Sequence, residues 1–166
     1  RGGGTPWGAI VVAENATVAK TKADKLIQAK RTIDKDWVYA VSSKDGEIVK
    51  GENASGPKVA ILDLGTKQNI VRLAQKYAKE IKIFNSRSSV EEINAYNPQA
   101  ILLTNGPGDP ADVKIAADTT RSFIGKRPIY GICMGHQILC LALGAKTYKL
   151  KFGHRGSNHP IKDEVI

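Results

Sequence analysis

From Lys58 onward, short apolar runs alternate with amphipathic stretches along the chain. The apolar runs predict five strands, over 59–64, 81–84, 100–104, 128–132 and 146–151. The stretches between them predict four helices, over about 68–79, 90–96, 111–125 and 134–143. Near-continuous apolar strands that alternate with helices indicate a parallel sheet covered on both faces. In such a sheet the functional loops lie at the carboxyl ends of the strands.

The first 57 residues follow a different pattern. We predict a strand over 8–13, a helix over 17–30 and a hairpin whose strands, 37–42 and 47–50, meet at a turn on Lys44-Asp45-Gly46. Residues 51–57 read GENASGP, a composition typical of a linker or a domain boundary. The pattern therefore predicts two parts, 1–50 and 58–166, joined by 51–57.

Length and composition exclude several classes of protein. The chain has 166 residues, 42% of them hydrophobic, which is enough for one sizeable core or for one domain and a piece of a second. It contains no run of about 18 uncharged apolar residues and no charged-then-apolar leader, so we expect neither a membrane span nor a signal peptide.

The net charge of +9 would suit a nucleic-acid partner, but the distribution of the charge does not. The lysines are spread along the chain, and no basic stripe is interleaved with aromatic residues that could stack on bases. We interpret the charge as solvated faces or as a docking surface for an acidic partner, and predict no nucleic-acid and no membrane partner. Cys133 and Cys140 lie in one predicted strand-to-helix segment, where a mutual disulfide is geometrically implausible, which favours a reducing cytosol and a cytoplasmic location.

The stretch YGICMGHQ, residues 130–137, places a cysteine where a predicted strand turns into a predicted helix. Glycines on both sides of Cys133 suit a tight elbow with unusual backbone dihedrals. Such an elbow puts the sulfur at a helix N-terminus, which favours the thiolate, and aims the Met134 N–H at an oxyanion formed by attack. A buried structural cysteine is the alternative interpretation, and Cys140 fits it well. Cys133 is therefore a candidate nucleophile.

A second loop is expected at the same edge of the sheet. Residues 105–110, NGPGDP, follow another predicted strand, and two glycines that flank a proline make a stiff loop. Its backbone N–H groups can serve as a second oxyanion donor or as a ligand clamp. Taken alone, the motif is only a turn. Neither G-x-x-x-x-G-K-[ST] nor G-x-G-x-x-G occurs in the chain, which argues against a phosphate-binding loop.

Four segments together resemble the small, glutamine-hydrolysing subunit of carbamoyl-phosphate synthetase. They are LDLGTKQNIVR at 62–72, LTNGPGDP at 103–110, YGICMGHQ at 130–137 and KFGHRGSNHPI at 151–161. GxCxGHQ with an upstream GPG loop is shared by class I, triad-type glutamine amidotransferases, including those that serve anthranilate, aminodeoxychorismate and GMP synthesis. The first and last segments look specific to the carbamoyl-phosphate branch. The resemblance is strong over 58–166 and weaker over 8–57.

The resemblance implies a fold and a domain organisation. The expected fold is α/β, with a flavodoxin-like open parallel sheet, present in part, and helices on both of its faces. Residues 58–166 would be the first part of the glutamine amidotransferase domain, and residues 1–50 the tail of a smaller α+β amino-terminal domain.

The resemblance also implies roles for individual residues. Cys133 would attack the side-chain amide of glutamine, form a glutamyl thioester and release ammonia. Gly106 and Met134 match the positions whose N–H groups form the oxyanion hole, while Gly108 and Gln137 match positions that line the glutamine site. His136 lies three residues along the helix, a poor geometry for reaching back to Cys133, and its place in the motif suggests a structural role.

A cysteine nucleophile of this type requires a histidine base oriented by a carboxylate. In the family that His-x-Glu pair lies several dozen residues beyond the HRGSNHP segment, so we expect it outside these 166 residues. His154 and His159 fall within that segment, which does not match the triad position. This chain is accordingly expected to be an internal fragment that is inactive alone.

The resemblance implies L-glutamine and the large subunit of carbamoyl-phosphate synthetase as partners. ATP and Mg²⁺ are expected on that large subunit, and no cofactor or metal in this chain. The choice between pyrimidine and arginine synthesis stays open. Two alternatives also remain: another class I amidotransferase, of the anthranilate or GMP type, and a non-catalytic docking fragment. KFGHRGSNHP argues against the first, whereas the unmatched His-Glu pair motivates the second.

Overall fold

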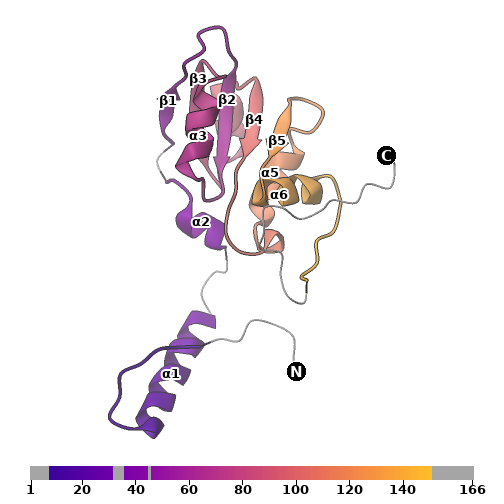
Figure 1. Cartoon of the computed structure of the whole chain (residues 1–166). Helices are drawn as coiled ribbons and strands as arrows, with labels where there is room; N and C mark the ends of the chain where they lie inside the picture. The colour runs from indigo at the N-terminus through magenta and orange to yellow at the C-terminus, as the bar shows by residue number, and fades with distance from the viewer. Residues whose placement is uncertain (1–7, 32–35, 45, 151–166) are drawn as a thin grey trace. The chain divides into compact units, whose positions relative to one another are not determined.

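The computed structural model describes residues 8–31, 36–44 and 46–150. The chain divides into two compact units: one comprises 34–147, and the other comprises 1–33 with 148–166. In the second unit, the helix α1 (Ala16–Arg31) confirms the helix predicted over 17–30. All the other helices and strands belong to the unit 34–147 (Figure 1).

A five-stranded sheet organises the larger unit, in the order β1-β3-β2-β4-β5. Its strands are β1 (Ile48–Lys50), β2 (Lys58–Asp63), β3 (Glu80–Asn85), β4 (Ala100–Leu103) and β5 (Ile129–Gly131). The last four pair in parallel, and β1 pairs antiparallel with β3 at one edge. From β2 the chain passes first to β3 on one side and then to β4 on the other. The strand order therefore reverses between β2 and β4, and ligands of open α/β sheets bind at the carboxyl end of such a reversal.

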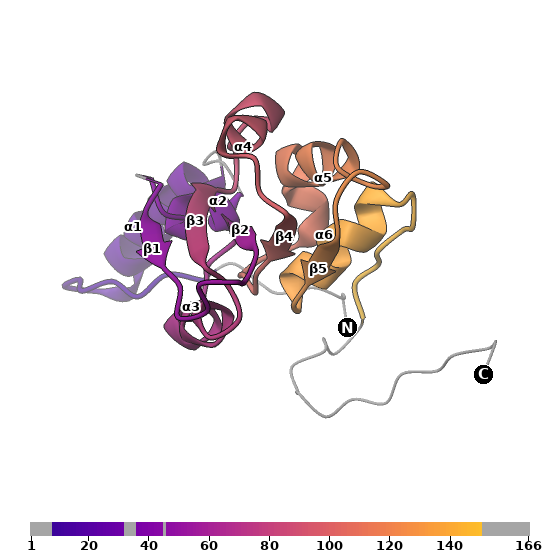
Figure 2. The ribbon, with the colours of Figure 1, turned by 90° about the horizontal axis from the view of Figure 1, so that it is seen from above.

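Alternate residues of the strands face two separate cores. Ile61 of β2 and Ile81 of β3 pack with Val71 of α3 (Gln68–Gln75) on one face. Leu62 and Leu103 face the other side, which is covered by α4 (Val90–Tyr96), α5 (Lys114–Arg121) and α6 (Met134–Ala142). Figure 2 shows α3 on one side of the sheet and α4 and α5 on the other. The α/β sheet with helices on both faces is thus confirmed.

Local signals set several of the helix boundaries. Ser89 and Glu92 form a capping box at the start of α4, and Asn97 ends that helix with a left-handed φ of 52°. The helix predicted over 111–125 is shorter than expected. Asp109 caps a single 3-10 turn, η1 (Pro110–Asp112), before α5 begins at Lys114. Because Pro110 fixes the first turn, the α-helical hydrogen-bonding pattern starts later.

Two of the predicted strands have no counterpart. Residues 8–13 form no strand, and Ile10 is 100% exposed. Residues 146–150 are also irregular, while Lys151, the last residue of that predicted strand, lies outside the described residues. An alternating apolar pattern makes a strand only where a neighbouring strand accepts its hydrogen bonds, and the described residues provide none for either segment.

The predicted hairpin is also wrong. Residues 37–42 form a short helix, α2 (Trp37–Val41), while β1 pairs with β3 instead of with this segment. Asp36 caps the helix through its side chain, and Val38 is fully buried in the core. The cap and the burial of one face outweigh the strand propensity of the WVYAV segment.

Residues 51–57, predicted to be a linker, pack against the turn that follows α3. The N–H groups of Gly51 and Glu52 donate to the carbonyl oxygens of Lys79 and Gln75, at 3.0 and 2.8 Å. The bond to Gln75 satisfies a carbonyl at the end of α3, which ends at Gln75 and not at the predicted residue 79. The domain limits remain a prediction, although β1 shows that residues before 51 contribute an edge strand to this sheet.

Candidate active site

The turn from β5 into α6 holds Cys133 in a rare backbone conformation. Its φ is 56° and its ψ is −108°, and the residue is the exposed N-cap of α6. Non-glycine residues seldom adopt positive φ, and they persist there only where the surrounding structure imposes it. The sharp elbow that the sequence predicts at YGICMGHQ is therefore present.

Close backbone contacts impose this conformation. A Cβ on Gly135 would lie 2.3 Å from the Leu103 carbonyl oxygen, and one on Gly131 would lie 2.6 Å from the Gly135 carbonyl. The absence of side chains lets α6 start directly above β4. The N–H of Gly135 donates to the Thr104 carbonyl at 2.9 Å, and that of Ile132 donates to the Leu103 carbonyl at 2.9 Å. These bonds join the elbow to the end of the neighbouring strand.

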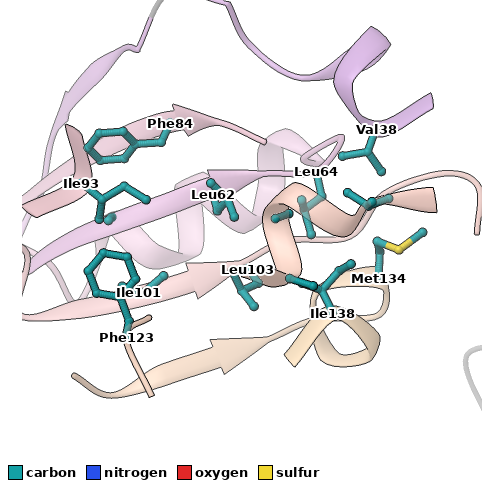
Figure 3. Packing of buried hydrophobic residues seen from close by; sticks show 14 of the residues in the cluster. Val38, Leu62, Leu64, Phe84, Ile93, Ile101, Leu103, Phe123, Met134 and Ile138 are labelled. Carbon is teal, nitrogen blue, oxygen red and sulfur yellow. The ribbon is translucent and has the colours of Figure 1, made fainter. Parts of the chain in front are cut away.

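The first turn of α6 contains both a buried side chain that anchors the helix and polar groups that are available to a ligand. Met134 buries its side chain beside Ile138 in the core, as Figure 3 shows, and so anchors the helix. Its backbone N–H has no acceptor among the described residues, as an oxyanion donor requires. Gln137, one turn further on, is exposed, and its N–H donates to the Cys133 carbonyl at 3.2 Å. The helix therefore offers a free donor next to Cys133 and an exposed amide one turn away.

The NGPGDP loop begins next to this elbow, because Thr104 accepts the bond from Gly135. Asn105 fixes the loop to the β2–α3 connection: its amide donates to the Gly65 carbonyl at 2.9 Å and its oxygen accepts from the Lys67 N–H at 3.0 Å. Gly106 lies so close to β2 that a Cβ would be 2.0 Å from the Leu64 carbonyl oxygen. Its own N–H has no acceptor within the described part of the chain.

Asp63, at the end of β2, organises the loops on this edge. The N–H groups of Ser43, Gly65 and Thr66 and the Thr66 hydroxyl all donate to its carboxylate, at 2.7–2.9 Å. Burial raises the pKa of Asp63, but these hydrogen bonds lower it by more, so the pKa lies below its ordinary value. The Thr66 hydroxyl continues the network to the Thr104 hydroxyl at 2.8 Å. Sequence reasoning missed this network; the signal was a lone acidic residue at the end of an apolar strand.

Of the three histidines, the structure describes only His136. The Nε2 of His136 lies 3.7 Å from the Sγ of Cys140, one turn further along α6, which agrees with a structural role. His154 and His159 lie outside the described residues. Within the described ranges, no group of three or more His, Cys, Asp or Glu side chains could hold a metal ion.

The structure thus brings the predicted site residues to one edge of the sheet. Cys133, Met134 and Gln137 follow β5, and Gly106 and Gly108 follow β4, its parallel neighbour. The β2–α3 connection adjoins them through Asn105, at the point where the strand order reverses. An exposed cysteine at such an elbow, with unengaged N–H groups at Met134 and on the loop that follows the neighbouring strand, would suit attack on a carbonyl or amide carbon.

The family model "Glutamine amidotransferase class-I" matches residues 60–165. The chain belongs to this family. The match covers the sheet from Ala60 of β2 onward, together with both loops of the candidate site.

Three relatives of this amidotransferase chain are each named as a carbamoyl phosphate synthase small chain. This chain is 44% identical to the small chain of Clostridium perfringens, over 99% of this chain and 45% of that protein. It is 50% identical to the small chain of Caldanaerobacter subterraneus subsp. tengcongensis, over 65% of this chain and 30% of the relative. It is 44% identical to the chloroplastic small chain of Arabidopsis thaliana, over 77% of this chain and 28% of that protein. The amidotransferase chain therefore spans less than half the length of these relatives.

Where the described chain is concerned, no helix combines the length and the apolar character needed to cross a lipid bilayer.

Proposed function

We propose that the protein is the glutamine-hydrolysing subunit of a carbamoyl phosphate synthase, which releases ammonia for a large synthetase subunit. The observation that carries the proposal is the conformation of Cys133, whose φ of 56° sets an exposed sulfur at the start of α6 beside the NGPGDP loop. A buried structural cysteine would need neither the strained backbone nor the exposure. The names of the relatives support the carbamoyl phosphate branch over the anthranilate and GMP branches.

In the proposed reaction, the thiolate of Cys133 attacks the side-chain amide carbon of glutamine. A carbon–sulfur bond forms, and the electron pair of the carbonyl moves onto oxygen. The N–H groups of Met134 and Gly106 stabilise this oxyanion, since neither has an acceptor among the described residues. When the carbonyl re-forms, the carbon–nitrogen bond breaks, and the nitrogen takes a proton and leaves as ammonia. Water then hydrolyses the thioester to glutamate.

The proposal assigns the proton transfers to a histidine paired with a glutamate, both outside this chain. His136 is engaged with Cys140 and is not assigned this role. Gly108 and Gln137 would line the glutamine pocket. We further propose a cytoplasmic location. ATP and Mg²⁺ would bind to the large subunit, since this chain has no phosphate-loop signature.

The test uses the protein expressed from its complete reading frame, with and without a large subunit. We expect glutamine hydrolysis to be faster with the large subunit present. Cys133→Ser should lower this hydrolysis by at least about a thousandfold while ammonia-dependent carbamoyl phosphate synthesis continues. Hydrolysis that survives in Cys133→Ser would refute the proposal. Rapid turnover by the 166-residue chain alone would refute only the assignment of the base to outside residues.

A further inference from the structure

Helix α2 contacts the loops of the candidate site, although the sequence pattern indicated no functional residue in this segment. We propose that Trp37 is a positioning residue: it holds the NGPGDP loop in the conformation that binds glutamine, an inference that rests on the function proposed above.

The side chain of Trp37 adjoins Gly108 on the side where a Cβ would stand. An ideal Cβ on Gly108 would be 3.4 Å from Cδ1 and 3.6 Å from Cβ of Trp37, which is van der Waals distance. Gly108 has a φ of +88°, which glycine adopts without steric cost, so the backbone conformation alone does not fix the loop. One turn along α2, Cγ2 of Val41 would be 3.1 Å from a Cβ on Gly65, and Cδ of Pro107 would be 3.0 Å from it. One short helix therefore packs against both loops at the strand reversal.

The N-terminal end of α2 is fixed from the carboxyl end of β3. Nε and Nη2 of Arg87 each donate to Oδ2 of Asp36 at 3.1 Å, while Oδ1 of Asp36 accepts from the Tyr39 N–H at 2.9 Å. The Arg87 guanidinium also lies over the Tyr39 ring, 3.9 Å from its centroid. This clamp of Asp36, Arg87 and Tyr39 sets the orientation of the helix that carries Trp37.

The C-terminal end of α2 is fixed to β2 and β3. The Ser42 hydroxyl donates to the Asp63 carbonyl at 2.6 Å and accepts from the Ser86 N–H at 2.8 Å. Between the two ends, Val38 is turned toward Leu64 in the core (Figure 3). An isolated helix of five residues is unstable in water, so these contacts determine its position.

In the NGPGDP loop, Gly106, Pro107 and Gly108 donate no backbone hydrogen bonds within the described residues. Pro107 has no N–H to donate. Unengaged donors suit a loop that binds a ligand, but they leave packing to fix its shape. Trp37 is 46% exposed, so it packs against the loop on one side without being part of the core. It can therefore be altered with little loss of stability.

We expect Trp37→Ala, in the protein from its complete reading frame, to raise the KM for glutamine about tenfold and to change kcat by less than about threefold. Trp37→Phe should keep most of the wild-type affinity, because an aromatic ring still covers Gly108. Tyr77→Ala removes an aromatic residue just beyond α3 that is 73% exposed, and it should leave the KM unchanged. Arg87→Gln loosens the clamp, leaves the indole intact and should raise the KM about threefold. This variant provides a second measurement if Trp37→Ala fails to fold.

Labelling of Cys133 separates positioning from a general disturbance of the fold. The rates of alkylation by a chloroketone analogue of glutamine and by iodoacetamide are compared in each variant. Trp37→Ala should slow only the glutamine analogue. An unchanged KM in folded Trp37→Ala and Arg87→Gln, or an equal loss of rate with both reagents, would overturn the inference. Absence of glutamine hydrolysis in the wild-type protein would instead overturn the proposed function.

Discussion

The elbow at Cys133 and helix α2 meet the same edge of the sheet, yet their sequences specify them in different ways. At the elbow, Gly131 and Gly135 are required because any Cβ would collide with backbone atoms. In α2, no residue is required by local geometry, and the segment becomes helical through Asp36, Arg87 and a buried Val38. A motif set by steric necessity can be interpreted from sequence, whereas a segment set by distant contacts cannot.

The largest expected effect tests the steric basis of the elbow. Gly135→Ala should lower the free energy of unfolding by about 3 kcal/mol or more, because the new methyl group would meet the Leu103 carbonyl. Urea denaturation measures the loss. Gly125→Ala is the matched control: its φ is +74° but the space is open, so about 1 kcal/mol is expected. Equal losses in both would contradict steric control of the elbow.

The second prediction tests the tertiary basis of α2. Val38→Ala should lower the free energy of unfolding by about 2.5 kcal/mol, because the side chain is fully buried between α2 and the sheet. The same denaturation experiment measures it. Val12→Ala, at a residue that is 92% exposed, should change stability by less than about 0.5 kcal/mol. A negligible effect at Val38 would show that α2 is not held by the core.

The third prediction concerns Asp63, which joins the two regions. Asp63→Asn should cost about 2 kcal/mol at neutral pH, since a carboxylate that accepts four hydrogen bonds is replaced. The folded-state pKa of Asp63 lies below the ordinary value of an aspartate side chain. The carboxylate therefore stabilises the fold fully above the unfolded-state pKa, and this stabilisation is lost as the pH falls through the folded-state value.

The stability difference between wild type and Asp63→Asn should accordingly shrink between about pH 6 and about pH 3. Denaturation midpoints across that range measure it. Asp118→Asn, which removes an exposed ion pair with Arg121, serves as the control and should cost less than about 1 kcal/mol throughout. A difference at Asp63 that grows on acidification would contradict the assigned direction of the pKa shift.

The smallest expected effect separates strain from function at the elbow. Cys133→Gly should raise the free energy of unfolding by about 1 kcal/mol, because glycine adopts a φ of 56° without steric cost. Cys133→Ala keeps the Cβ and should leave stability within about 0.5 kcal/mol of wild type. Both variants should lose glutamine hydrolysis. Equal stability of the two would indicate that the elbow stores no strain.

Much of the fold followed from the sequence because the relevant interactions are local. The apolar runs identified β2 to β5 within one or two residues, and the helical periodicity identified α3 to α6, since each pattern reflects one element packed on one sheet. Cys133 was recognisable for the same reason. Five consecutive residues, GICMG at 131–135, are enough to indicate a sharp turn at the cysteine.

Only the tertiary structure decided the conformation of segments that depend on distant partners. Residues 8–13 and 37–42 have patterns compatible with strands, but the first has no partner and the second is capped and buried as a helix. The packing of Trp37 on Gly108 and the hydrogen bonds to Asp63 join residues dozens of positions apart. The sequence alone therefore determined the elements of the sheet from β2 to α6 and the candidate nucleophile. The sheet determined which loops meet around that nucleophile, because such contacts exist only once the strands have paired.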